Sequence, residues 1–228
     1  MTTHELDPMD LAALLCSRVC HDVISPVGAI VNGLEVLEDE QDAAMREVAL
    51  ELIKKSAASA SARLQFCRLA FGAAGSAGAS IDTGDAEAVA RGLLATEKTS
   101  LAWNAARRLV PKNKVKLLLN LCLIAAGTIP RGGVLSVDLT GEGDEIAIKV
   151  AAQGLNARLA SGVSELLVGR PEGGRVDAHT IQPYFAGLVA RQCGMEIEAA
   201  TAPEAVTLIA RPLAPAALAP APEAAATV

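Results

Sequence analysis

Aromatic residues make up only 2% of the 228-residue sequence, and basic residues are not in excess. The formal net charge is −6, so the chain lacks the basic surface that neutralises nucleic-acid phosphates. Apolar runs of about 18 residues without polar interruption are missing, as are the basic start and apolar core of a signal peptide. These absences predict a cytoplasmic chain with no nucleic-acid partner and no membrane span.

The number and spacing of the cysteines argue against disulfides and against a metal site. Five are present, an odd number, and none forms a Cys-x-x-Cys pair, so we expect reduced thiols. Cys16 and Cys20 are four residues apart and can share a helix face, but two thiols alone make a poor zinc site. Metal binding is therefore not expected. The hydrophobic content of 51% against 20% charged residues favours a compact fold over disorder.

The first long element is an amphipathic helix that starts at Asp7-Pro8 and runs to about Leu37. Asp and Pro are both favoured in the first turn of a helix. At about 100° per residue, one broad stripe collects the apolar side chains, which are Leu11, Leu15, Val19, Val23, Val27, Ile30, Leu34 and Leu37. This stripe predicts the buried face of the helix.

His21 points away from the stripe, and its neighbours on the helix surface at related spacings are Ser17, Arg18, Ser25, Gly28 and Asn32. A neutral imidazole carries a ring nitrogen lone pair that can attack phosphorus, and Asp22 can orient the ring or take its other proton. An ordinary surface histidine is the alternative interpretation. Pro26 argues against it, because a proline inside a helix costs on the order of 3 kcal/mol and needs a reason.

The segment from His21 to Val27, His-Asp-Val-Ile-Ser-Pro-Val, resembles the phosphoacceptor box of sensor histidine kinases. The resemblance implies that His21 is phosphorylated and that Asp22 is its acidic partner. It also implies that Ser25 can place a hydrolytic water and that Pro26 kinks the helix. In that family the box lies on an antiparallel helical hairpin, and two hairpins form a dimeric four-helix bundle.

The rest of the chain fits this organisation. An acidic turn at 38–42 separates the first helix from a second one at 43–71, so the two helices must pack antiparallel. The hairpin leaves apolar surface to cover, which predicts a homodimer. We divide the chain into a hairpin domain (1–78), an α/β domain (79–212) and an Ala/Pro-rich tail (213–228), which we expect to be disordered.

The second domain alternates short strands and helices. Strands are expected at 79–82, 100–104, 134–139, 145–151, 195–200 and 205–211, and helices at 85–95, 112–126, 157–168 and 178–192. This order predicts an α+β fold in which the hairpin is followed by an α/β sandwich. The sandwich resembles the ATP-binding domain of sensor histidine kinases.

Within that resemblance, the groups that would hold ATP and magnesium are replaced. Ile124 stands where the family has its magnesium-binding asparagine, and Gly127 stands in place of a lysine. Ala152 replaces the aspartate that contacts adenine, and Asn156 replaces a glycine. A second glycine-rich loop, whose converging amides would cradle phosphate, is missing near 180–189. The chain is therefore expected to have no nucleotide or metal cofactor of its own.

A kinase-like chain without nucleotide groups resembles the alphaproteobacterial ChpT family of histidine phosphotransferases. The resemblance implies an Asp-His-Asp phosphorelay in cell cycle regulation, from the receiver of a CckA-like hybrid kinase to CtrA-like and CpdR-like response regulators. The receiver would bring its own Mg²⁺. It would dock on the small or polar residues around His21, which are Ser17, Arg18, Pro26, Gly28, Ala29 and Asn32. A divergent active histidine kinase and a non-enzymatic dimeric scaffold remain as alternatives.

Overall fold

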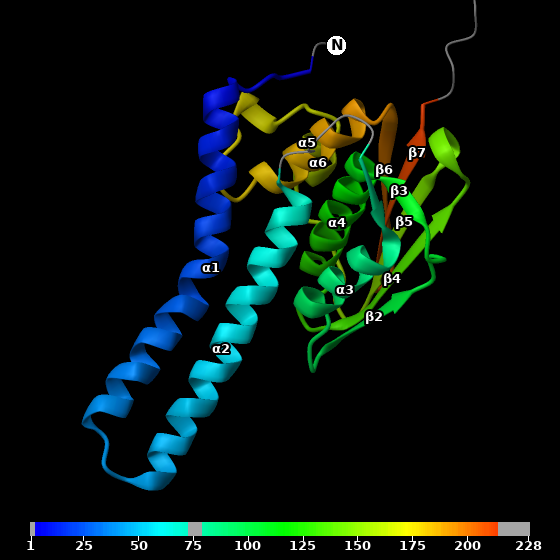
Figure 1. The fold of residues 1–228 in the computed structure, drawn as a ribbon. Helices are drawn as coiled ribbons and strands as arrows, with labels where there is room; N and C mark the ends of the chain where they lie inside the picture. Colours follow the sequence, from blue (N-terminus) through cyan, green and yellow to red (C-terminus); the bar gives the residue numbers. More distant parts are fainter. Residues whose placement is uncertain (1–2, 73–78, 214–228) are drawn as a thin grey trace, which may run out of the picture.

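A computed structural model describes residues 3–72 and 79–213, and Figure 1 shows a long helical hairpin beside a compact sheet domain. The hairpin consists of α1 (Pro8–Asp39) and α2 (Ala43–Ala70). Each helix begins at an aspartate whose side chain accepts a backbone hydrogen bond: Asp7 from Met9 at 2.8 Å and Asp42 from Met45 at 3.0 Å. The expected linker beyond Gly72 and the expected tail beyond Leu213 lie outside the described residues.

The expected apolar stripe of α1 divides between two surroundings. Val19, Val23, Ile30 and Leu37 are half-buried, whereas Val27 and Leu34 are exposed. Gly33 is the buried residue of α1, and a Cβ at this position would lie 2.7 Å from Cγ1 of Ile53 in α2. The glycine therefore lets the two helices approach closely. Residues 27 and 34 lie on a second apolar line that the single chain leaves open.

The N-terminal part of α1 packs against the second domain. Leu11 and Leu15 join a small apolar cluster around Leu166, Ile181 and Tyr184. The preceding segment is tied to the same place, because the Tyr184 hydroxyl donates to the His4 carbonyl oxygen at 2.9 Å and accepts from the Leu6 amide at 3.1 Å. This end of the hairpin is therefore fixed to the α/β domain.

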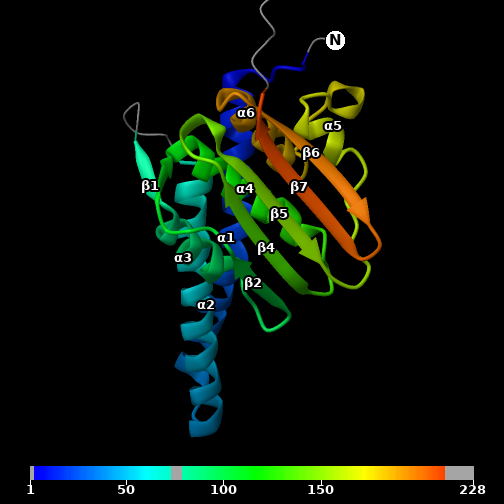
Figure 2. The ribbon, with the colours of Figure 1, turned by 90° about the vertical axis from the view of Figure 1, so that its right-hand side faces the viewer.

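The second domain is built on a five-stranded mixed sheet with the strand order β2-β4-β5-β7-β6. These strands are β2 (Thr99–Trp103), β4 (Gly133–Thr140), β5 (Ala147–Gln153), β7 (Ala205–Pro212) and β6 (Met195–Ala202). β2 and β4 are parallel, and the other pairs are antiparallel. Figure 2 shows the helices behind the sheet and the other sheet face open.

The helices of this domain are α3 (Thr83–Leu94), α4 (Lys112–Gly127), α5 (Val163–Leu167) and α6 (Ile181–Gln192). In β5, Ile148, Val150 and Ala152 are buried beneath the helices, while Lys149 on the alternate face is exposed. Two further short strands, β1 (Ser80–Asp82) and β3 (Leu109–Pro111), pair antiparallel beside the main sheet. The predicted fold class, a helical hairpin followed by a helix-covered sheet, is confirmed.

Two details of the predicted domain were wrong. The helix expected at 157–168 is shorter, because an irregular segment leads to Gly162, whose φ of 78° is left-handed, and only then does α5 begin. The Arg158 amide in this segment donates to the Thr128 carbonyl oxygen at 2.9 Å, which replaces a helical bond. Strand β3 was not predicted, since three residues that end in Pro111 carry too little pattern.

The base of the hairpin and the α/β domain share one hydrophobic core. Phe66 and Ala70 of α2 are fully buried in the cluster that α3, α4 and the sheet form. Asn120 of α4 lies in the same region and donates through Nδ2 to the Ala70 carbonyl oxygen at 2.9 Å. Its Oδ1 accepts from Nε2 of Gln182 in α6 at 3.0 Å. The predicted boundary near residue 78 thus divides the chain in sequence, but the elements on its two sides pack in one core.

Among the described helices, α1 alone is long and apolar enough to cross a membrane, with a mean hydropathy of 1.4 in its most apolar window. This property is weak evidence for a membrane span. Half-buried side chains of the same helix pack against α2 and against the α/β domain, and the helix carries Arg18 and Asp22 near its middle.

Candidate functional site

His21 lies near the middle of α1 and presents its ring to solvent. The side chain is 75% exposed, whereas the side chain of its neighbour Asp22 is 17% exposed and that of Arg18 is 25% exposed. The helix continues unbroken through Pro26, which has no N–H to donate to the Asp22 carbonyl oxygen four residues earlier. The imidazole is therefore accessible to another protein, as expected from its place on the helix.

The Asp22 carboxylate lies between the side chains of Arg18 and His21. Its Oδ2 accepts a hydrogen bond from Arg18 Nε at 3.0 Å, and its Oδ1 lies 3.5 Å from His21 Nδ1. The carboxylate thus lies beside Nδ1 of a ring that is otherwise largely exposed. Arg18, which belongs to the expected docking surface, uses its Nε on Asp22.

The remaining predicted residues divide by exposure. Ser17, Ser25 and Asn32 are exposed, while Pro26, Gly28 and Ala29 are half-buried. A Cβ built on Gly28 would meet nothing within 4 Å, so open space adjoins the helix backbone there. The structure thus brings the exposed residues and Gly28 to the surface around His21, and it turns Ala29 partly toward the interior of the hairpin.

A hollow of about 200 Å³ lies behind the Arg18–Asp22 pair, between the hairpin and the α/β domain. Its lining includes Arg63 and Cys67 from α2 and Leu123 from α4. Burial raises the pKa of the Cys67 thiol, and the Asp22 carboxylate acts in the same direction, while Arg18 and Arg63 oppose it. The charged pair beside His21 therefore lies at the junction of the two parts of the chain.

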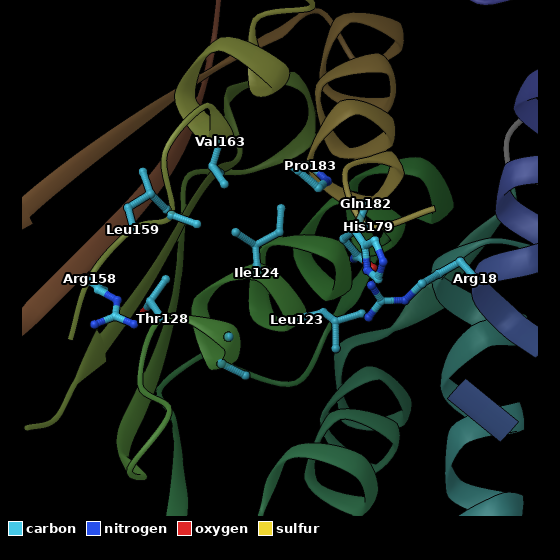
Figure 3. Close-up of a pocket in the computed structure, with 13 residues that line it drawn as sticks. Arg18, Leu123, Ile124, Thr128, Arg158, Leu159, Val163, His179, Gln182 and Pro183 are labelled. Carbon is cyan, nitrogen blue, oxygen red and sulfur yellow. The ribbon is translucent and has the colours of Figure 1, made fainter. Parts of the chain in front are cut away.

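A second hollow, of about 350 Å³, occupies the region where the kinase resemblance places the nucleotide. Figure 3 shows Thr128 and Arg158 at one end and Ile124 in the middle, while Arg18 extends from α1 toward Leu123, His179 and Gln182 at the other end. Gln182 is 4% exposed, and its Oε1 has no hydrogen-bond partner within the described chain. Sequence reasoning missed Leu123 and Gln182, because apolar and amide residues inside helices carry no signal of a site.

The lining of this second hollow contains no carboxylate among the described residues. Ile124 is buried in the core at the position of the expected metal ligand, and Ala152 is buried in β5. Hard divalent cations prefer oxygen ligands, which these hydrocarbon side chains cannot offer.

Asn156 and Gly154, in the loop beside this hollow, have backbone conformations or contacts that the fold itself explains. Asn156 has a φ of 61°, a left-handed conformation that asparagine tolerates better than most residues. A Cβ at Gly154 would lie 2.3 Å from the carbonyl oxygen of Gly132, so the backbones could not pass each other. These positions therefore shape the loop without implying a bound phosphate.

An exposed histidine on a helical hairpin, packed against a helix-covered mixed sheet, defines a protein of the histidine kinase and histidine phosphotransfer class. The family model for the histidine phosphotransferase C-terminal domain matches residues 83–205. Protein phosphotransferase ChpT of Brucella abortus (strain 2308) is 53% identical over 192 residues, which cover 84% of this chain and 90% of that protein. The chain belongs to the ChpT family of histidine phosphotransferases.

A solved structure has the same architecture. A bacterial phosphotransferase with 47% sequence identity aligns at a TM-score of 0.83 and covers 92% of this chain and all of its own. The histidine kinase AdeS of Acinetobacter baumannii also matches, with 10% identity and a TM-score of 0.45, over 84% of this chain and 96% of that one.

Proposed function

We propose that this phosphotransferase relays a phosphoryl group between receiver-domain aspartates through Nε2 of His21, without using ATP. The observation that carries the proposal is the arrangement at His21, whose ring is 75% exposed while Asp22 Oδ1 lies 3.5 Å from Nδ1. A carboxylate on Nδ1 favours the tautomer in which this nitrogen holds the proton. The lone pair is then on Nε2, the nitrogen that a partner can reach.

The transfer balances without an external acid or base. Nε2 attacks the phosphorus of an aspartyl phosphate, the N–P bond forms, and the P–O bond to the receiver carboxylate breaks. The ring becomes positively charged with its proton still on Nδ1, and the Asp22 carboxylate stabilises that charge. In the second transfer, the carboxylate of another receiver attacks the same phosphorus and the neutral ring returns.

The chemistry of the second hollow supports a chain that takes phosphate from a protein. Its lining offers no carboxylate for magnesium among the described residues, and Mg²⁺ is expected on the receiver. Ser25 is exposed one turn after His21, and we expect it to hold a water that hydrolyses phosphohistidine. An active kinase is the second candidate. A calorimetric titration with Mg-ATP decides between the two, since heat of binding would favour the kinase.

The partners we propose are the receiver of a CckA-like hybrid kinase and the CtrA-like and CpdR-like response regulators of cell cycle control, in the cytoplasm. The exposed apolar side chains of the hairpin support a homodimer with a four-helix bundle. They recur at three- and four-residue spacings on both helices, at Ile24, Val27, Val31 and Leu34 of α1 and at Met45, Val48 and Leu52 of α2. The alternative function, a non-enzymatic dimeric scaffold, would need only this apolar surface and not His21.

The direct test mixes the protein with a receiver that carries radiolabelled aspartyl phosphate and follows the label. The wild-type protein should take up the label and pass it to a second receiver, and His21→Ala should do neither. His4→Ala is the matched control, because it removes another imidazole but keeps the backbone carbonyl that binds Tyr184. Label that still appears on His21→Ala would show that the phosphoacceptor is elsewhere.

A further inference from the structure

Arg18 connects the phosphoacceptor to the α/β domain. Its side chain leaves α1 one turn before His21 and lines both hollows at the junction, as does Leu123 of α4. In Figure 3 it extends toward Leu123, with His179 and Gln182 beside it. Its Nε donates to Asp22 Oδ2 at 3.0 Å, so the outer part of the side chain is held between the domain and the carboxylate.

The geometry assigns each oxygen of Asp22 to one neighbour. Oδ2 is held by Arg18, and Oδ1 faces His21 Nδ1 at 3.5 Å. An aspartate on a helix surface without a partner samples several rotamers, and most of them do not present an oxygen to the adjacent ring. A charge-assisted hydrogen bond from a half-buried arginine selects one rotamer of the carboxylate.

We infer that Arg18 is a positioning residue, through which the α/β domain orients Asp22 and thereby selects the His21 tautomer that has a free Nε2. This inference rests on the proposed function, since it concerns the reactivity of the same ring. It gives the domain a part in the transfer that needs no nucleotide. The contact between Arg18 and Asp22 exists before any partner arrives.

Arg18→Gln tests the first step, because glutamine cannot supply a cationic donor to Asp22. The ratio of the two neutral His21 tautomers can be read from ¹⁵N shifts of histidine-labelled protein at alkaline pH. We expect the Nδ1–H form to dominate in the wild type and to lose population in Arg18→Gln. Phosphotransfer should slow about tenfold, as when an orienting partner of a reactive ring is lost.

Arg63→Gln is the matched control for charge. Arg63 lines the same hollow as Arg18 and Asp22, but its Nε donates to Ser59 Oγ at 3.4 Å and not to the carboxylate. It should leave the tautomer ratio unchanged and alter the transfer rate by less than about twofold. Equal slowing in both arginine variants, or an unchanged ratio in Arg18→Gln, would overturn the inference.

The part played by the domain is tested with two leucines. Leu123→Ala removes the α4 side chain beside Arg18, and Leu159→Ala trims another half-buried leucine, at the opposite end of the second hollow in Figure 3. We expect only Leu123→Ala to shift the tautomer ratio, in the same direction as Arg18→Gln and by less. Equal shifts in both leucine variants would refute the role of the domain.

The two proposals can fail separately. A wild-type protein that takes no phosphate from a receiver would refute the proposed function. The tautomer ratios of the arginine and leucine variants would still decide whether Arg18 positions the ring, because they are measured without a partner or a transfer reaction.

Discussion

The proposed homodimer would bury the exposed apolar line of the hairpin, so a single charge in this line should weaken it. Val31 is 48% exposed and lies in the middle of this line on α1. Val134 at the start of β4 is 44% exposed, on the α/β domain. Val31→Asp should therefore break the dimer, whereas Val134→Asp introduces the same charge at a similar valine outside the proposed interface.

The expected magnitude follows from burial. The seven exposed apolar side chains of the line, from Ile24 to Leu34 on α1 and from Met45 to Leu52 on α2, retain between 41% and 67% of their accessibility. Full burial of such a side chain contributes about 1.5–3 kcal/mol, so covering the remaining half contributes about 1 kcal/mol each. Val31→Asp loses this burial energy on both protomers. It also places two carboxylates in an apolar interface, which costs several kcal/mol per ion. A loss of about 5 kcal/mol or more raises the Kd of the dimer over a thousandfold.

Sedimentation equilibrium over a range of protein concentrations measures this Kd. The wild type and Val134→Asp should sediment as dimers, and Val31→Asp should be a folded monomer with unchanged circular dichroism at low concentration. A Val31→Asp protein that dimerises as tightly as the wild type would refute the placement of the interface. Equal weakening by both aspartates would instead point to general charge repulsion.

Stability measurements by urea unfolding test the packing of the hairpin. Gly33→Ala should lower the free energy of unfolding by about 1 kcal/mol, because the added methyl group contacts Ile53. Gly28→Ala meets no neighbour and should raise the free energy of unfolding by up to about 1 kcal/mol. The opposite order of stabilities would contradict the helix packing. Asn120→Ala should cost about 2–4 kcal/mol, because it leaves buried polar groups, including Gln182 Nε2, without their partner. A smaller loss than about 1 kcal/mol would show that the amide does not tie the hairpin to the domain.

The hairpin was predictable from local chemistry. Asp7 and Asp42 are helix caps that the sequence displays directly, and the structure starts α1 at Pro8 and α2 at Ala43, as expected. The alternating strands of the sheet were also predictable in type and order. The division of the apolar stripe of α1 was not, because residues that face α2 and residues that face solvent have the same composition and differ only in their partner.

Where the sequence-based prediction was wrong, contacts between residues that are distant in the chain decide the local structure. Leu159 and Val163 have a helical spacing, but the Arg158 amide binds Thr128 and the chain stays irregular up to Gly162. At the candidate site, the position and exposure of His21 followed from helix periodicity. The engagement of Arg18 with Asp22 follows the i, i+4 rule, whereas its burial against Leu123 required the placement of α4.

The shared core at the base of the hairpin has a kinetic consequence. Phe66 and Ala70 of α2 belong to the same cluster as α4, so the described part of the hairpin packs directly against the α/β domain. We therefore expect a receiver to meet a preassembled surface and to lose little conformational freedom on association. We expect the exchange of one receiver for the next, and not an internal swing of the protein, to set the pace at which the phosphoryl group moves on.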